Sequence, residues 1–264
     1  MTAQPLKYYL NMTKFAVVTS MDHAYYEKCG RACIESFNAY WPNSIPLYVY
    51  DEGIQDRPKL KTVHYQPWTD LGKDYEEFIA GPWTSRTITF AKKAFSIMAG
   101  ARDIDCDRLI WLDADVITLQ GINQHLLDLI SPPEVLSTHY GVLHPWPSDT
   151  DQTRFSFSCE TGFFILNRRH AMFETMMNRY QNWYVTGKGN ELRRFYDGEV
   201  YGAVIKEMEN EGAKVMELNP EHRHRTPIPR SVMAPYIMHY KAGAKEPFNS
   251  EMLLQNHGIS SSLS

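Results

Sequence analysis

The sequence lacks the basic excess that a nucleic-acid-binding protein normally carries. Its 264 residues include 27 Lys and Arg against 31 Asp and Glu, a net charge of −4. Positive charge supplies much of the affinity for phosphate backbones, so binding to nucleic acid is not expected. Hydrophobic residues make up 43% and charged residues 22%, close to the averages for globular domains, so the chain can bury a core.

Long apolar runs are also missing. Runs such as residues 163–166 are only a few residues long, whereas a membrane-spanning helix needs roughly 18 or more. Residues 1–14 contain Lys7 and Lys14 but no apolar stretch of the kind found in signal peptides. We therefore expect no membrane span and a cytoplasmic protein.

The sequence has only four cysteines, Cys29, Cys33, Cys106 and Cys159, and no CxxC pair. So few cysteines cannot cross-link a chain of this size. Cys29 and Cys33 lie four residues apart in a predicted helix. This spacing favours two buried small side chains over half of a zinc site.

Short β-rich runs alternate with amphipathic helical stretches along the chain, which predicts an α/β fold with a central, mostly parallel sheet flanked by helices. The predicted strands are 15–20, 45–50, 61–65, 109–112, 162–167 and 236–240, and the predicted helices are 23–40, 168–185, 198–209 and a longer one that begins at Thr84 or Ser85. We expect one domain over residues 1–264, with peripheral tails at 1–13 and 250–264. The long irregular segment 144–158 is a candidate for substrate contact.

A pair of carboxylates spaced D-x-D is the first candidate site. The spacing occurs four times, at Asp103/Asp105, Asp105/Asp107, Asp113/Asp115 and Asp149/Asp151. Only Asp113 and Asp115 follow a strongly apolar strand, where open α/β sheets collect their ligands. Two carboxylates there can bind Mg²⁺ or Mn²⁺. The alternative is a strand-ending turn in which the aspartates cap a helix.

Three later features add to this candidate. Gly162 opens a predicted strand and would let the backbone approach a sugar or a phosphate closely. Asp197 begins a predicted helix, either as a functional carboxylate or as a partner of the helix dipole. His239 ends a predicted strand and is followed by Lys241 and Lys245. An imidazole could bind the metal and the ammonium groups could bind phosphates, although a histidine beside apolar neighbours is often only a core residue.

Taken in order, LIWLDAD, ETGFFILN, Asp197 and HYKAGAKEPF resemble the nucleotide-sugar glycosyltransferases of the GT-A fold, especially the glycogenin and lipopolysaccharide galactosyltransferase family. The resemblance spans residues 15–248. It implies a single-domain, Rossmann-like GT-A fold and a Mn²⁺ (or Mg²⁺) site. By this resemblance Asp113, Asp115 and His239 would bind the metal, Thr19 and Ser20 with Asp22 or Tyr25 would contact the donor base, and Arg86 and Lys93 would lie near the donor.

The implied activity is transfer of a sugar from a nucleoside diphosphate sugar, most simply a UDP-sugar, to a glycan, lipid-linked or protein-linked sugar acceptor. Lys245 and either Arg223 or Arg225 would stabilise the departing diphosphate. Asp197 is the first choice for the catalytic carboxylate and Glu160 the second. Retention of configuration is slightly favoured, with the departing phosphate as the base. The aromatic residues Trp83, Tyr140, Trp146, Phe155 and Tyr196 are candidates for stacking on sugars.

The family pattern is not matched everywhere. Gly243 and Lys245 lie four and six residues after His239, and Pro247 and Phe248 replace the usual end of the motif. These departures leave the sugar and the stereochemical outcome open.

Three other functions compete with this interpretation. A haloacid-dehalogenase-like phosphatase also has D-x-D after an apolar strand, but it needs the pair on its first strand and a later acidic cluster. A sugar nucleotidyltransferase needs a glycine-rich loop after the first strand, and residues 19–26 contain no glycine. A carbohydrate-binding relative without turnover would keep the fold, although it would have no need of both aspartates and the histidine.

Overall fold

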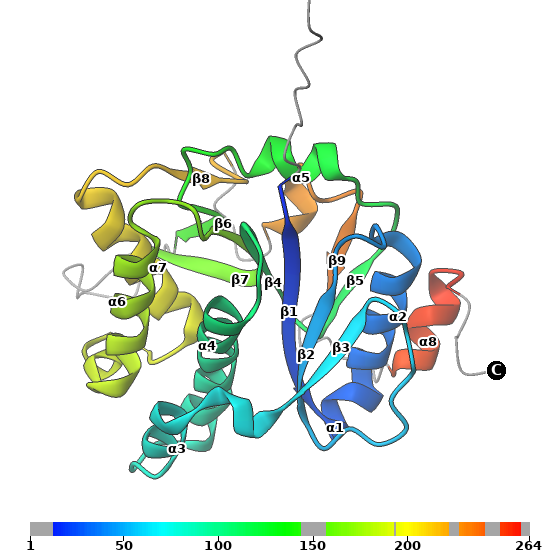
Figure 1. Cartoon of the computed structure of the whole chain (residues 1–264), viewed down its shortest axis with the longest axis horizontal. Helices are drawn as coiled ribbons and strands as arrows, with labels where there is room; N and C mark the ends of the chain where they lie inside the picture. Colours follow the sequence, from blue (N-terminus) through cyan, green and yellow to red (C-terminus); the bar gives the residue numbers. More distant parts are fainter. Residues whose placement is uncertain (1–12, 144–156, 193, 222–226, 241–248, 260–264) are drawn as a thin grey trace, which may run out of the picture.

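The computed structural model describes residues 13–143, 157–192, 194–221, 227–240 and 249–259. Its centre is a seven-stranded sheet in the order β3-β2-β1-β4-β7-β6-β8 (Figure 1). The strands are β1 Phe15–Asp22, β2 Leu47–Glu52, β3 Val63–Pro67, β4 Arg108–Leu112, β6 Ser137–Leu143, β7 Phe157–Asn167 and β8 Val215–Glu217. Four strand pairs are parallel, and β7 runs antiparallel to both β4 and β6. The predicted α/β fold with a mostly parallel sheet is confirmed.

A second, two-stranded sheet fixes the geometry of the candidate site. Strand β5, Val116–Thr118, follows β4 after a short turn and pairs antiparallel with β9, Ile237–His239. In this register Val116 lies opposite His239. A residue near the end of the chain is therefore held next to the residues that immediately follow β4.

Helices cover both faces of the large sheet (Figure 1). They are α1 His23–Tyr25, α2 Arg31–Tyr40, α3 Lys73–Ile79, α4 Ser85–Asp103, α5 Gln124–Ile130, α6 Phe173–Val185, α7 Asp197–Asn210 and α8 Ser250–Asn256, with a π-helical turn η1 at Tyr26–Gly30 and 3₁₀ turns η2 Trp68–Leu71, η3 Lys188–Glu191 and η4 Ile228–Arg230. Alternate residues of β7 enter different cores: Phe164 packs with α4, α6 and α7, and Phe163 packs with α2 and α5. The buried sheet is thus a rigid support for the loops at its edge.

Several predicted elements differ from the observed ones. The helix expected over 23–40 is interrupted by η1. The helix expected from residue 168 begins at Phe173, because the side chains of Asn167 and His170 accept hydrogen bonds from the backbone N–H groups of Arg169 and Met172 and hold a turn. Residues 250–256, expected in a polar tail, form α8, in which Leu253 and Leu254 are buried. Of the segment 144–158, residues 144–156 lie outside the described residues.

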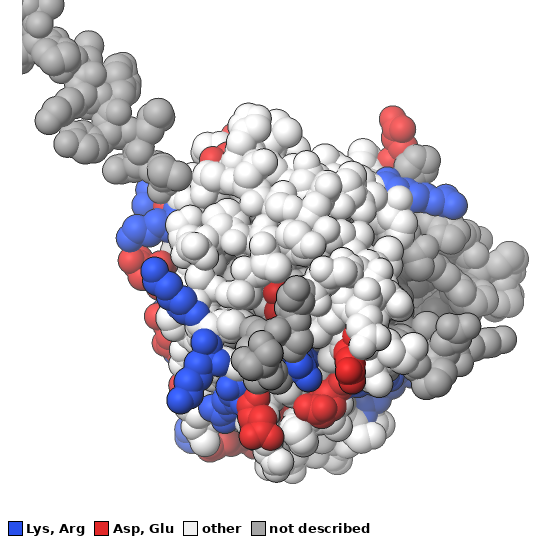
Figure 2. All heavy atoms as spheres, turned by 90° about the vertical axis from the view of Figure 1, so that its right-hand side faces the viewer, with Lys and Arg blue, Asp and Glu red and all other residues white. Residues whose placement is uncertain are grey.

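The sequence predicts no membrane-spanning helix and no binding to nucleic acid, and the structure bears on both. Among the described residues, no helix combines the length and apolarity needed to cross a membrane. Figure 2 views the face that lies on the right in Figure 1, and there Lys and Arg are interspersed with Asp and Glu along one margin rather than gathered into a basic field. The four cysteines are free and buried, as the sequence predicts.

Candidate metal centre and cavity

The two aspartates and the histidine meet at the junction between β4 and β5. Asp113 and Asp115 lie in the turn that follows β4, which closes with a backbone hydrogen bond from Val116 N to the Asp113 carbonyl (2.9 Å). His239 Nε2 lies 3.0 Å from Asp115 Oδ1 and 3.7 Å from Asp113 Oδ2. One ligand atom from each of the three residues lies within 4.8 Å of the other two. The structure therefore brings together the three predicted metal ligands.

This donor set fits a divalent cation. Carboxylate oxygens suit Mg²⁺ and Mn²⁺, and the imidazole nitrogen favours Mn²⁺ over the harder Mg²⁺. Burial raises the pKa of Asp113, which a nearby cation would counteract. The phenol of Tyr25 donates a hydrogen bond to Asp115 Oδ2 (2.8 Å) and orients that carboxylate.

Glu160 contacts the other side of the histidine ring. Its Oε1 lies 3.4 Å from His239 Nδ1, and both side chains are 9% exposed. Burial opposes the positive charge on His239, but the contacts and negative charges of Asp115 and Glu160 outweigh it and raise the pKa of His239 to about 10. This carboxylate lies within ion-pair distance of Nδ1, the position at which other metal-binding histidines have a partner that orients the ring.

Lys93 pairs with two carboxylates beside the metal centre. Its Nζ lies 2.7 Å from Asp113 Oδ1 and 2.8 Å from Asp197 Oδ2, and it donates to the carbonyl of Thr161 (2.6 Å). Burial opposes the charge on Lys93, yet the two carboxylates raise its pKa above the ordinary value. The hydroxyl of Thr161 also donates to Asp197 Oδ2 (2.6 Å). One buried ammonium thus links the end of β4 to the start of α7.

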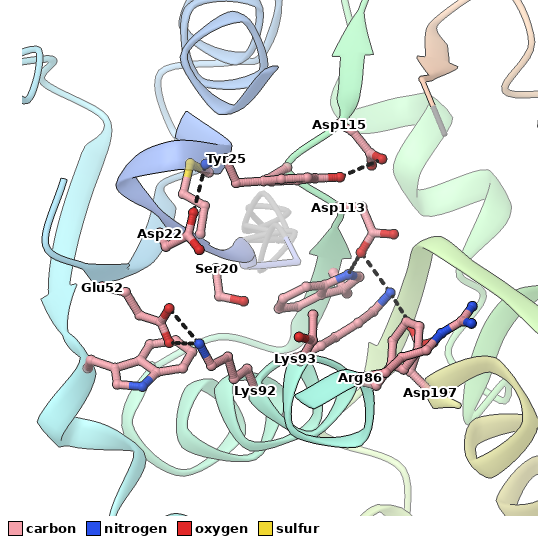
Figure 3. A pocket seen from close by; sticks show the side chains of 16 residues that line it. Ser20, Asp22, Tyr25, Glu52, Arg86, Lys92, Lys93, Asp113, Asp115 and Asp197 are labelled. Carbon is pink, nitrogen blue, oxygen red and sulfur yellow. Dashed lines mark hydrogen bonds and ion pairs between the residues drawn. The ribbon is translucent and has the colours of Figure 1, made fainter. Parts of the chain in front are cut away.

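A cavity of about 430 Å³ opens beside these residues (Figure 3). Its lining comes from the ends of β1, β2 and β4, the turn after β4, η2, one face of α4, and the residues at the end of α1 and the start of α7. The lining residues are Ser20, Met21, Asp22, Tyr25, Glu52, Trp68, Arg86, Thr89, Phe90, Lys92, Lys93, Trp111, Asp113, Ala114, Asp115 and Asp197. Asp113 Oδ1 is held there by the indole N–H of Trp111 (2.6 Å) as well as by Lys93. The arrangement follows the rule that open α/β sheets bind ligands at the carboxyl ends of their strands.

The cavity has two chemically different ends. Figure 3 shows Ser20, Asp22, Glu52 and Lys92 on one side of Asp113 and Lys93, and Arg86 and Asp197 on the other. Arg86 stacks on the ring of Tyr196, with its guanidinium carbon 4.2 Å from the ring centroid. An extended ligand whose middle lay at the metal centre would place its two halves at these two ends.

Several predicted site residues occupy other positions. Thr19 is completely buried and does not line the cavity, so among these two neighbours Ser20 is the one that reaches it. Glu160 contacts His239 from behind and does not line the cavity. The prediction that Tyr140 stacks on a sugar is wrong, because its ring is fully buried. Trp83 stacks on Phe78, with ring centroids 4.9 Å apart.

Other predicted residues lie outside the described part of the chain, namely Lys245, Arg223, Arg225, Trp146 and Phe155. Sequence reasoning in turn missed Glu52, Trp68, Phe90, Lys92 and Trp111 as cavity residues. Only the position of Glu52 at the end of a predicted strand carried a signal, since strand ends of parallel sheets meet at one edge.

Comparisons with solved structures identify the fold of this chain. Neither the known protein families nor the curated proteins contain a match to the sequence. Among solved structures, the chain is similar to galactosyltransferase LgtC in complex with donor and acceptor sugar analogues, at 17% identity and a TM-score of 0.56, covering 94% of this chain and 97% of that one. It is also similar to mouse xyloside xylosyltransferase 1, at 14% identity and a TM-score of 0.52, covering 78% and 85%. The glycosyltransferase GlyE of Streptococcus pneumoniae matches at 15% identity and a TM-score of 0.54, covering 95% and 62%. The predicted GT-A fold is confirmed by these matches.

Proposed function

We propose that this protein is a metal-dependent glycosyltransferase that moves a sugar from a nucleoside diphosphate sugar, in the first instance a UDP-sugar, to a hydroxyl of a glycan, lipid-linked or protein-linked sugar acceptor. The observation that carries the proposal is the convergence of Asp113, Asp115 and His239 at the edge of a cavity in a GT-A fold. The similarity to a galactosyltransferase and a xylosyltransferase supports the reaction class and leaves the sugar open.

The main electrostatic demand of this reaction is the negative charge that develops on the departing diphosphate. When bound by Asp113, Asp115 and His239, Mn²⁺ supplies positive charge that stabilises the diphosphate. Tyr25 and Glu160 hold two of these ligands in position. The positive charge of Lys93 offsets part of the negative charge of Asp113 and Asp197, which favours binding of an anion in a cavity with several carboxylates.

Asp197 is the carboxylate that we place at the reacting sugar. Its Oδ2 is engaged by Lys93 and Thr161. Both of these contacts are made to Oδ2, and the residue lines the cavity. Asp197 can therefore hold a sugar hydroxyl through Oδ1. We favour retention, with the departing phosphate as the base, so that Asp197 acts by holding the sugar rather than by accepting a proton.

Thermal unfolding tests the proposal. The protein is heated with UDP-, GDP- and CMP-sugars, each with and without Mn²⁺. A ligand at about 100 times its dissociation constant should add roughly 2.7 kcal/mol to the free energy of unfolding, which raises the melting temperature by several degrees for a chain of this size. Stabilisation by UDP-sugar and Mn²⁺ together supports the proposal. No shift with any of them, combined with hydrolysis of small phosphoesters, would replace it with a phosphatase.

A further inference from the structure

The end of the cavity away from Asp197 holds an ion pair whose function the metal centre does not explain. Glu52, the last residue of β2, pairs with Lys92 of α4, and Lys92 Nζ lies 2.6 Å from Glu52 Oε2 and also contacts Oε1. The same ammonium lies 5.4 Å from the ring centroid of Trp68. All three residues line the cavity (Figure 3).

The charges at this end decide which part of a nucleoside diphosphate sugar can lie there. Asp22 and Glu52 are register partners on the neighbouring strands β1 and β2, and both line this end of the cavity. They would repel a diphosphate, which belongs at the metal centre. The sugar lies at Asp197 if the proposed function is correct, so the nucleoside occupies the end that Glu52 and Lys92 form.

The pair also has a fixed hydrogen-bonding polarity. A carboxylate only accepts hydrogen bonds and an ammonium only donates them. Uracil presents an N–H group beside a keto oxygen on one edge, whereas cytosine of the same size and shape has these two positions reversed, with a ring nitrogen that accepts and an amino group that donates. Trp68, half-buried, supplies an aromatic face beside this edge.

We propose that the Glu52–Lys92 pair reads the base edge of the donor, with Glu52 accepting from the uracil ring N–H and Lys92 donating to the adjacent keto oxygen. This inference rests on the proposed function and adds to it the residues that select the nucleotide. The side chains of Glu52 and Lys92 are 16% and 28% exposed, so a bound base would shield the pair further from water and strengthen these bonds.

Binding of UDP and CDP in the presence of Mn²⁺ tests the proposal, because these two nucleotides differ only on the edge in question. We expect wild-type protein to bind UDP more tightly than CDP by about tenfold or more, since a charged hydrogen bond lost on a buried edge costs at least that much affinity. Glu52→Gln and Lys92→Met should each reduce the UDP/CDP ratio toward one. Near-UV circular dichroism and the melting temperature show that each variant is folded.

The chain offers a matched control. Lys188 pairs with Glu207 at 3.1 Å and lies 4.2 Å from the ring centroid of Trp183, the same three residue types outside the cavity lining. Glu207→Gln should leave the UDP/CDP ratio unchanged. The exchanged variant Glu52→Lys with Lys92→Glu restores an ion pair but inverts its polarity, so it should not recover the preference for UDP.

Three results would overturn the inference. They are equal binding of UDP and CDP by wild-type protein, an unchanged ratio in Glu52→Gln, and full recovery of the UDP preference in the exchanged variant, which would show a purely structural ion pair. A Glu52→Gln variant that loses only its preference for UDP over 2′-deoxy-UDP would assign Glu52 to the ribose instead. If wild-type protein binds neither nucleotide with Mn²⁺, the proposed function itself fails.

Discussion

The backbone of Gly162 lies directly against the imidazole ring of His239. A Cβ atom on residue 162 would lie 2.6 Å from His239 Nδ1 and 2.7 Å from Cε1. The backbone of Gly162 also contacts that of a predicted metal ligand, because its carbonyl accepts a hydrogen bond from Asp113 N (2.9 Å). The sequence predicts that this glycine gives a sugar or phosphate access to the backbone. The structure provides another reason, which is room for the metal-binding histidine.

Replacement of Gly162 by alanine should therefore weaken metal binding. The added methyl group must displace the His239 ring from its position between Asp115 and Glu160, and disturbing the support of a metal ligand typically costs about 10- to 100-fold in affinity. Titration calorimetry with Mn²⁺ measures the effect. Gly121→Ala is the control, since a Cβ there meets no atom within 4 Å. Equal affinities in the two variants would contradict the proposed link.

Mn²⁺ affinity should rise with pH. Burial works against the charge on His239, but Asp115 and Glu160 raise its pKa to about 10, so the ring carries a proton at neutral pH that the ion must displace. Below pH 10 each unit of increase removes part of this competition, and the affinity should increase about tenfold per unit. Calorimetry at pH 6.0, 7.0 and 8.0 gives the slope.

His239→Gln provides the comparison for this slope. The amide oxygen can still bind the ion but carries no competing proton, so affinity should be lower at pH 8.0 and change less with pH. The explanation fails if wild-type protein binds Mn²⁺ equally well at pH 6.0 and 8.0, or if both proteins give the same slope.

The neighbouring lysines Lys92 and Lys93 should differ in their contribution to stability. Lys93→Met leaves Asp113 and Asp197 without their shared cation at a site where Lys93 itself is 7% exposed, and removal of one partner from such a network costs about 3 kcal/mol. Lys92→Met breaks a more exposed pair and should cost about 1 kcal/mol or less. Urea unfolding at pH 7 compares them. Similar losses would show that Lys93 is not the electrostatic centre of the site.

Asp197→Asn should separate binding from turnover. An amide keeps the shape of the side chain and an oxygen for Lys93, so affinity for UDP with Mn²⁺ should stay within about threefold of wild type. The loss of the negative charge beside the reacting sugar should slow UDP release from a UDP-sugar by about 100-fold or more. A turnover rate near that of wild type would remove Asp197 from the reaction.

The sequence contains enough local information to predict the central strands and the first metal ligands. The apolar run at 109–112 and the aspartates after it identify the site because strand periodicity and strand ends are local features. The start of α4, with its N-cap at Thr84, is local in the same sense. The observed position of Asp113 and Asp115 agrees with this prediction.

Contacts between segments far apart in the sequence could not be predicted from such local features. The antiparallel register that places Val116 opposite His239 joins residues more than a hundred positions apart. The pairing of Glu52 with Lys92 also depends on how α4 packs across the sheet. Helix α8 was missed because its burial depends on packing against α2 and η1 rather than on its own polar composition.

Release of UDP from a UDP-sugar is the most direct test of the proposed activity. Wild-type protein is incubated with UDP-glucose, UDP-galactose and UDP-xylose, with Mn²⁺ or with a chelator, and Asp115→Asn is measured in parallel. We predict Mn²⁺-dependent release from at least one donor by wild-type protein and at least a 100-fold lower rate in Asp115→Asn. Absence of release from every donor, with hydrolysis of a small phosphoester that depends on Asp113, would contradict the account.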